Sequence, residues 1–237
     1  MRTKIVASLL AAGCLFGSCA SVFAQDMNGV LVGIDAREKS NYGYLGYTRH
    51  YGENPLDDGI ISRFVGFSGR YKYDSTAVSS GHVNGDYKAF EALVGYKKNF
   101  DSFVLLSYIG AEFEEHDLSP KNFADRNRGN HWGGKARVDL ETNFSSQNYG
   151  NLIATYGTAR DRYWVRARGG RDFSGYVVGP EIIATGDREA HEERIGAFLN
   201  FRNFLPAYLS VSAGQAKSPK TSAGYTPYIT MEYSTTF

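Results

Sequence analysis

The sequence lacks any apolar run after residue 24 that could cross a bilayer as a helix, which takes about eighteen or more residues. It also has little cysteine: the only two are Cys14 and Cys19, both near the start of the chain. Histidines are few, and none stands in a metal-binding H-x-x-x-H or H-E-x-x-H pattern. No G-x-S-x-G motif of a serine hydrolase occurs. These absences argue against a helical membrane protein and give no catalytic residue, metal site or cofactor to predict.

The first residues have the pattern of a secretory signal. Arg2 and Lys4 precede a short apolar stretch over residues 5–16, and Val22-Phe23-Ala24 forms an A-x-A-like cleavage site. We therefore predict a signal peptide over residues 1–24 and a mature domain over residues 25–237. A buried N-terminal helix is one alternative. A lipoprotein signal, with Cys14 or Cys19 as the lipidated residue, is another.

Removal of this segment leaves a chain without cysteine and with almost no net charge. The whole chain has 26 basic and 25 acidic residues, so loss of Arg2 and Lys4 leaves 24 against 25, a net charge of −1. A disulfide framework is excluded, as is a thiolate metal site. The near-neutral balance also argues against a nucleic-acid partner, because nucleic-acid-binding domains are usually strongly basic.

What the sequence does contain is alternation with a period of two, which predicts β-strands. In the segment 131–144 the polar side chains are Lys135, Arg137, Asp139, Glu141 and Asn143. The positions between them are apolar or neutral. The same pattern predicts strands at about 28–37, 42–51, 60–73, 86–99, 102–115, 131–144, 148–158, 161–173, 175–186, 191–204, 207–216 and 225–237.

These segments favour an all-β fold: one antiparallel outer-membrane β-barrel of about twelve strands. Most of them exceed the nine to eleven residues that carry a tilted strand across a bilayer. An even count places both ends in the periplasm, and the long segments 74–85, 116–130 and 217–224 would then be outer loops. Tyrosines near strand ends fit interfacial aromatic girdles. A soluble periplasmic β-sandwich is the alternative, because it too buries one face of each strand.

The last segment gives the most specific signal. From Pro227 every second residue is largely apolar up to Phe237, and the residues between are polar or small. A strand with lipid on one side and a polar lumen on the other has this pattern. We expect Tyr233 and Phe237 to act as the membrane-assembly signal, with outer-membrane lipid around them.

The charged faces of these strands would line the lumen. Their members are Arg70, Lys72, Glu91, Lys97, Glu112, Glu114, Lys135, Arg137, Asp139, Glu141, Arg162, Arg166, Arg168, Glu181, Arg194, Arg202 and Glu232. One interpretation is a network of ion pairs that fills a narrow barrel, because isolated buried charges are costly. The other is a polar pore or carbohydrate slide, with Trp164, Arg166, Arg168 and Glu181 as the candidate contacts to substrate. The spacing does not separate the two.

Several segments, in order, resemble one known family. They are G-R-Y-K-Y-D (69–74), F-E-A-L-V-G-Y (90–96), G-A-E-F-E-E-H-D-L-S-P (110–120), R-N-R-G (126–129), G-G-K-A (133–136), Y-W-V-R-A-R-G-G (163–170), G-P-E (179–181) and R-I-G-A-F (194–198). This series is similar to the cellulose biosynthesis protein BcsS family over roughly residues 69–237. The resemblance implies a barrel-like envelope protein linked to bacterial cellulose production and carries over no catalytic residue.

The expected function is therefore non-catalytic: an outer-membrane barrel that assists cellulose synthesis, export or surface assembly. A cellulose chain or components of cellulose secretion would be its partners. A plugged scaffolding barrel and, further away, a lipid-modifying barrel enzyme remain as alternatives. The enzyme would need a paired histidine and serine on the lipid-facing surface, whereas Ser79 and Ser80 near His82 fall in a predicted loop.

Overall fold

The computed structural model is a closed barrel of twelve antiparallel strands. It describes residues 27–54, 57–121, 125, 127–142, 147–188, 190–202, 207–217 and 224–237. The predicted signal peptide, Cys14 and Cys19 lie outside these residues. No helix within the described ranges is long and apolar enough to span a membrane.

Every predicted strand is present, and each is paired with its neighbours in sequence. The strands are β1 (Asn28–Arg37), β2 (Ser40–Tyr51), β3 (Gly59–Asp74), β4 (His82–Asn99), β5 (Phe103–Ser119), β6 (Gly129–Thr142), β7 (Asn148–Gly157), β8 (Arg162–Asp172), β9 (Tyr176–Gly186), β10 (His191–Phe201), β11 (Tyr208–Lys217) and β12 (Tyr225–Thr236). The main difference from expectation is that β4 and β5 extend further, to His82 and Ser119.

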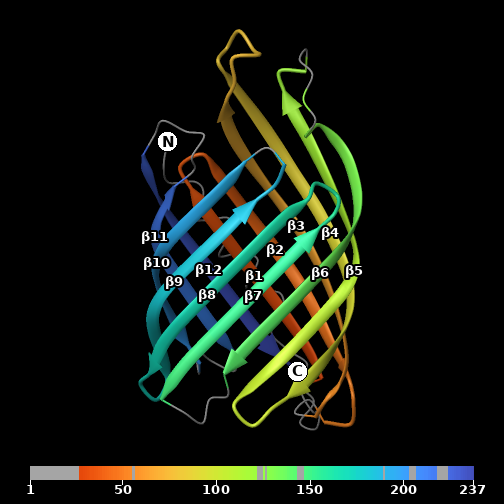
Figure 1. Ribbon diagram of the computed structural model, residues 1–237, viewed down its shortest axis with the longest axis vertical. Coiled ribbons are helices and arrows are strands. Elements are labelled where there is room, and N and C mark those ends of the chain that lie inside the picture. The colour runs from red at the N-terminus through yellow and green to blue at the C-terminus, as the bar shows by residue number, and fades with distance from the viewer. Residues whose placement is uncertain are drawn as a thin grey trace.

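The barrel closes where β1 meets β12. Nine pairs of residues, from Gly29 opposite Thr236 to Arg37 opposite Tyr228, form this antiparallel ladder. Beyond it, Asn28 and Phe237 exchange two backbone hydrogen bonds of 3.1 and 2.9 Å. We call the end of the barrel that carries these two residues the terminal end, and the opposite end the loop end. Figure 1 shows the terminal end below and the loop end above.

The outward surface of the barrel is apolar between two bands of aromatic side chains. Towards the loop end, Phe90, Phe113 and Trp132 stand opposite one another on β4, β5 and β6, and the rings of Phe113 and Trp132 lie 4.7 Å apart. Towards the terminal end, the rings of Phe100 and Phe103 stack at 4.5 Å. Phe100 follows Phe90 by ten residues in the sequence, and about nine to eleven residues carry a tilted strand across a bilayer. The two bands therefore match the girdles of a membrane barrel.

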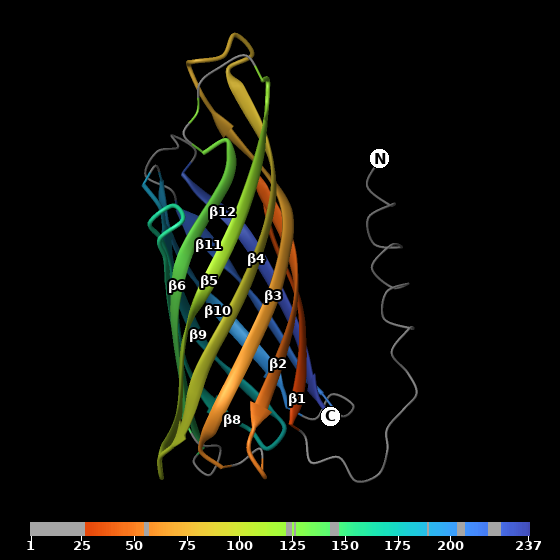
Figure 2. The same cartoon turned by 90° about the vertical axis from the view of Figure 1, so that its right-hand side faces the viewer.

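Beyond the upper band, strands β3 to β5 continue as a wall on one side of the barrel, which Figure 2 shows rising above the other strands. Its outward face is polar: Lys88 lies opposite Glu115, next to the Phe90–Phe113 pair. Near the tip, hydrogen bonds from Lys39 and His82 lower the pKa of the exposed Asp74 carboxyl. The change from apolar to polar side chains marks where the strands leave the membrane.

One residue predicted for the lumen lies on the outward face of this wall instead. Arg70 points outward, where its exposed side chain pairs with Asp86 at 2.9 Å, whereas Lys72 is among the residues that line the cavity. The prediction assumed that charged side chains point into the barrel. That assumption is valid only where the outward face of the strand contacts lipid. Above the membrane both faces of the wall meet water, so polarity no longer distinguishes inside from outside. On β3 the inward side chains there are Tyr71 and Tyr73, which pack against buried Leu118 and Val83.

The closing ladder leads to a prediction about assembly. Deletion of Phe237 removes its two backbone hydrogen bonds to Asn28 and an aromatic ring that is 53% exposed on the outward surface. We expect less folded barrel in the outer membrane, with secretion into the periplasm intact. Membrane fractionation with heat-modifiable gel mobility measures both.

The matched control is Phe237→Tyr, which keeps the ring and the backbone bonds and should assemble normally. Wild-type amounts of heat-modifiable barrel from the deletion variant would show that the Asn28–Phe237 closure is not needed for assembly.

Candidate functional site

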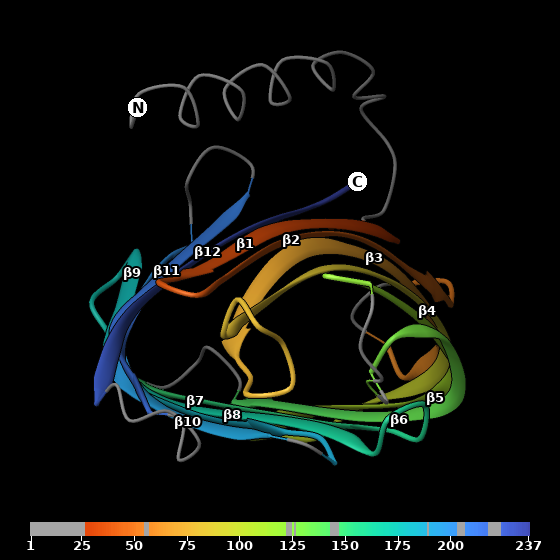
Figure 3. The same ribbon diagram turned by 90° about the horizontal axis from the view of Figure 1, so that it is seen from above.

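The barrel encloses a cavity of about 1,020 Å³. Its lining begins at the loop end with Asp74 and Asp187 and continues inward to Arg63, Arg168 and Glu181. Seen from above, the connection between β3 and β4 lies inside the outline of the barrel (Figure 3). The volume is at the upper end of the roughly 300–1,000 Å³ typical of small-molecule sites.

Towards the terminal end the interior is filled by side chains. Ile61, Leu93 and Tyr108 form one buried cluster. A second cluster consists of Tyr149, Val177 and Phe198, and Phe198 is 1% exposed. Neither cluster contributes to the lining of the cavity. Among the residues that the structure describes, the lumen is therefore a blind cavity that opens at the loop end.

The deepest polar contacts of the cavity surround Glu181 on β9. Arg168 on β8 donates from Nε to Glu181 at 2.5 Å, and its other nitrogens donate to Ser210 and Ser212 on β11. The hydroxyl of Tyr228 donates to the second oxygen of Glu181 at 2.9 Å. Glu181 is 1% exposed, so this carboxylate is held almost without water. Such a pair is stable only because every charged atom has a partner.

A second ion pair crosses the interior above the first. Arg166 on β8 donates to Glu232 on β12 at 2.8 Å, and Tyr44 on β2 donates to the same carboxylate at 2.7 Å. The guanidinium of Arg166 also lies over the ring of Trp164, 5.4 Å from its centre. These bonds join opposite walls of the barrel.

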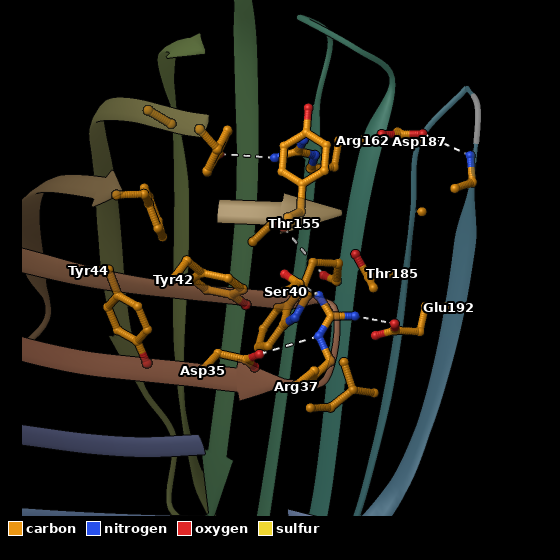
Figure 4. Close-up of a pocket in the computed structure, with 18 of the residues that line it drawn as sticks. Asp35, Arg37, Ser40, Tyr42, Tyr44, Thr155, Arg162, Thr185, Asp187 and Glu192 are labelled. Atoms are coloured by element: carbon orange, nitrogen blue, oxygen red, sulfur yellow. Dashed lines mark hydrogen bonds and ion pairs between the residues drawn. The ribbon is translucent and has the colours of Figure 1, made fainter. Parts of the chain in front are cut away.

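Nearer the mouth, β1 and β10 are joined in the same way. Arg194 binds Asp35 at 2.5 Å and Glu192 at 2.7 Å. Arg37 binds Glu192 as well, and its Nε lies 3.7 Å from Asp35 (Figure 4). Two arginines and two carboxylates thus form one closed cluster. The close-up also shows Tyr42 and Tyr44 on the neighbouring strand β2, beside Asp35.

The opposite wall, on β4 to β6, carries the carboxylates Glu91, Glu112 and Glu114. Lys135 reaches the first two at 2.9 and 3.1 Å. Arg162 reaches Glu114 at 3.0 Å and also donates to the hydroxyl of Tyr87. Both signs of charge therefore line this wall, and each charge named here has an opposite partner.

At the mouth, one arginine in a turn between two strands contacts residues in two other connections between strands. Arg160, in the turn between β7 and β8, is 8% exposed. It donates to Asn127 and Asp187, both at 2.6 Å, and contacts Nε2 of His116 at 3.0 Å. Nδ1 of His116 lies 2.8 Å from the hydroxyl of Tyr71. The contacts fix the shape of the mouth from the side of β5 to β9.

One wall of the cavity is aromatic. The rings of Tyr42 and Tyr44 lie 6.5 Å apart, and that of Phe67 lies 5.8 Å from Tyr44. Further out, the rings of Tyr71 and Tyr73 stack at 6.2 Å. Flat apolar faces beside hydroxyl and charged groups form the kind of surface on which a sugar ring stacks while its hydroxyls are hydrogen-bonded.

The four predicted contact residues Trp164, Arg166, Arg168 and Glu181 all line this cavity. Their interactions differ: Arg168 and Glu181 bind each other and their neighbours, whereas Trp164 is partly exposed. Contact with a substrate stays a prediction for all four.

Alternation could have located two inward residues that the sequence prediction omitted, Asp35 on β1 and Arg63 on β3. It gives no information about Arg160, because a turn has no repeating pattern.

Among the described residues, no group of three or more histidine, cysteine or carboxylate side chains could hold a metal ion. The structure also places the histidine and serine that were considered for a lipid-modifying enzyme. Ser80, which stands beside His82 in the sequence, donates its hydroxyl to the backbone carbonyl of His82 at 2.9 Å, and the His82 ring pairs with Asp74. The two residues lie at the exposed tip of the wall, away from the aromatic bands.

The deep ion pair leads to a prediction about stability. Glu181→Gln removes the carboxylate that Arg168 contacts directly and leaves it only the more distant Glu232, 3.7 Å away. The free energy of unfolding should therefore fall by about 3–5 kcal/mol. Replacing both residues, as Arg168→Met with Glu181→Leu, should recover much of this loss. Urea titration of the barrel refolded in detergent measures both variants.

The control is Asp161→Asn, which breaks the exposed pair with Arg188. That change should leave stability almost unaltered. Equal stability of Glu181→Gln and wild type would contradict the importance assigned to the buried pair.

Solved structures similar to this one are outer-membrane barrels. An outer membrane channel from Pseudomonas putida F1, COG4313, is 12% identical with a TM-score of 0.60, covering 91% of this chain and 97% of the other. The beta domain of the Bordetella autotransporter BrkA is 10% identical with a TM-score of 0.52, covering 90% and 100%. A KdgM porin is 9% identical with a TM-score of 0.50, covering 88% and 99%. These similarities, all at 12% identity or less, support the fold.

No protein with a curated function is similar enough in sequence to count as a relative. The family comparison is informative, because the model described as cellulose biosynthesis protein BcsS matches residues 30–237. That range covers the whole barrel apart from the first residues of β1, and the chain therefore belongs to the BcsS family of cellulose biosynthesis proteins.

Proposed function

We propose that this barrel acts without catalysis at the outer face of the outer membrane, where its cavity holds a stretch of glucan during surface assembly of cellulose. The observation that carries the proposal is the blind cavity: it opens at the loop end and is filled by side chains towards the periplasm. A polymer reaching the cavity would come from outside the cell. The predicted signal peptide over residues 1–24 would deliver the chain to the periplasm.

The chemistry of the walls supports a saccharide as the occupant. Tyr42, Tyr44, Phe67 and Trp164 offer ring faces along the cavity, and the ion pairs between them offer hydrogen-bonding groups. Because most of these charges are already neutralised by partners, the lining is polar without a large net field. A neutral polymer such as cellulose suits that surface.

The two tryptophans of the chain allow a direct binding test. Trp164 lines the cavity, whereas Trp132 is 75% exposed on the outward surface. In a Trp132→Phe background, Trp164 is the sole tryptophan, and titration with cellohexaose should give a saturable change in its fluorescence. Trp164→Ala should lose cellohexaose binding and lower cellulose output in cells, while Trp132→Ala should retain both.

Absence of any cellohexaose response, together with normal cellulose output from an assembled Trp164→Ala barrel, would reject the cavity as a glucan site.

Measurement of ion conductance tests whether the lumen is closed. In planar bilayers the wild-type barrel should show little ion conductance, because the clusters around Tyr108 and Phe198 obstruct the terminal end. The double variant Tyr149→Ala and Phe198→Ala should conduct measurably more, since it removes two of the rings that fill that end. A large steady conductance from the wild-type barrel would instead favour passage of polymer through the lumen.

A scaffold is the second candidate function, and the polar wall of β3 to β5 favours it. This wall rises beyond the membrane with exposed charged groups such as Arg70, Asp86 and Lys88 on its outward face. If cellulose output depends on these side chains and not on Trp164, the barrel would act by binding other secretion components rather than glucan.

A further inference from the structure

Among the described residues, one arginine of the cavity has no counter-ion. Arg63 on β3 lines the deep part of the cavity and is 9% exposed. Its Nε makes no hydrogen bond, and no carboxylate within the described ranges forms an ion pair with it. Every other arginine of the lining pairs with a carboxylate: Arg37, Arg137, Arg160, Arg162, Arg166, Arg168 and Arg194.

The carboxylates near Arg63 are committed to other cations. Glu91 and Asp139 are close enough to influence it electrostatically, but Lys135 binds Glu91 at 2.9 Å and Arg137 binds Asp139 at 2.8 Å. Arg137 itself adds a second positive charge near Arg63. A buried guanidinium with a like charge nearby is unfavourable unless an anion or water neutralises it. Lys135 also binds Glu112 at 3.1 Å, so the three cations and three carboxylates of this group balance. Arg63 differs from the other two cations in that none of these carboxylates contacts its guanidinium, which lines the cavity.

The surface above Arg63 is the aromatic wall. Phe67 follows Arg63 by four residues on the same face of β3, and its ring contacts that of Tyr44 on β2. A ligand that stacks a ring on these side chains could place an attached anionic group against the guanidinium. Planar carboxylates fit the two-pronged donor geometry of arginine especially well.

We infer that the deep part of the cavity binds an acidic saccharide, with a uronate carboxylate on Arg63 and its sugar ring against Phe67 and Tyr44. The site adds a ligand class to the neutral glucan proposed above and does not depend on it. Arg63 selects for the carboxylate, whereas Trp164, on the other side of the lumen, is the contact proposed for glucan.

The test compares two trisaccharides of equal length. Trigalacturonate and cellotriose are titrated into the refolded Trp132→Phe barrel, and binding is measured by calorimetry and by Trp164 fluorescence. We expect trigalacturonate to bind at least tenfold more tightly than cellotriose at low salt. Arg63→Gln should weaken trigalacturonate binding at least tenfold, while Arg63→Lys should weaken it less because the charge remains.

Two controls show whether a weaker affinity comes from the loss of a ligand contact or from a change in folding. Arg70→Gln removes an arginine from the same strand but from its outward face, so trigalacturonate binding should not change. Because Arg63 has no ion-pair partner to leave unpaired, Arg63→Gln should be no less stable to urea than wild type.

Three results would overturn the inference: unchanged trigalacturonate affinity in Arg63→Gln, equal affinity for the two trisaccharides, or displacement of trigalacturonate by chloride at equal concentration, which would indicate a site for small inorganic ions. Cellohexaose binding by Arg63→Gln tests glucan contact separately. Its survival alongside a failed trigalacturonate titration would reject the acidic site alone.

Discussion

The interaction on which the interior depends is the pairing of buried arginines with carboxylates from distant strands. Arg166 on β8 reaches Glu232 on β12, and Arg194 on β10 reaches Asp35 on β1. These bonds cross the lumen rather than follow a neighbouring strand, and the barrel has a flattened outline when seen from above (Figure 3). A buried charge needs a partner within a few ångströms, so each pair limits how far the walls it connects can separate. Pairing thus sets the width of the lumen as well as its polarity.

The same constraint divides the lumen into two parts. Towards the mouth, charged side chains hold one another at the walls and leave the cavity between them open. Towards the terminal end, Phe198 and Val177 take the inward positions on β10 and β9, and apolar side chains are most stable when they fill the space completely. The boundary falls at the Arg168–Glu181 pair, where the guanidinium lies 5.1 Å from the centre of the Phe198 ring. A blind cavity follows from this change in side-chain type along the strands.

The sequence predicted the strands because lipid and lumen require opposite side chains at alternate positions. Lys135 to Glu141 shows that pattern without interruption, and β6 covers this segment. The pattern fails where lipid is absent: Arg70 points outward on the wall, and Arg160 reaches the cavity from a turn. The partners were not predictable either. Arg166 and Glu232 lie 66 residues apart, and only the closed barrel brings them together.

Placing Trp164, Arg166, Arg168 and Glu181 in the lumen needed only alternation, but their separate roles needed the contacts. The hydrogen-bonding groups of Arg168 and Glu181 are used within the wall, whereas Trp164 remains partly exposed to the cavity. For Arg63, alternation identifies the inward position, but nothing in the sequence distinguishes this residue from the paired arginines. Its distinction is the lack of a carboxylate in an interior where the other arginines of the cavity each have one. Ion pairing stabilises the other buried arginines of the cavity. Because Arg63 lacks such a pair, it is the position where binding of an external anion would be most favourable.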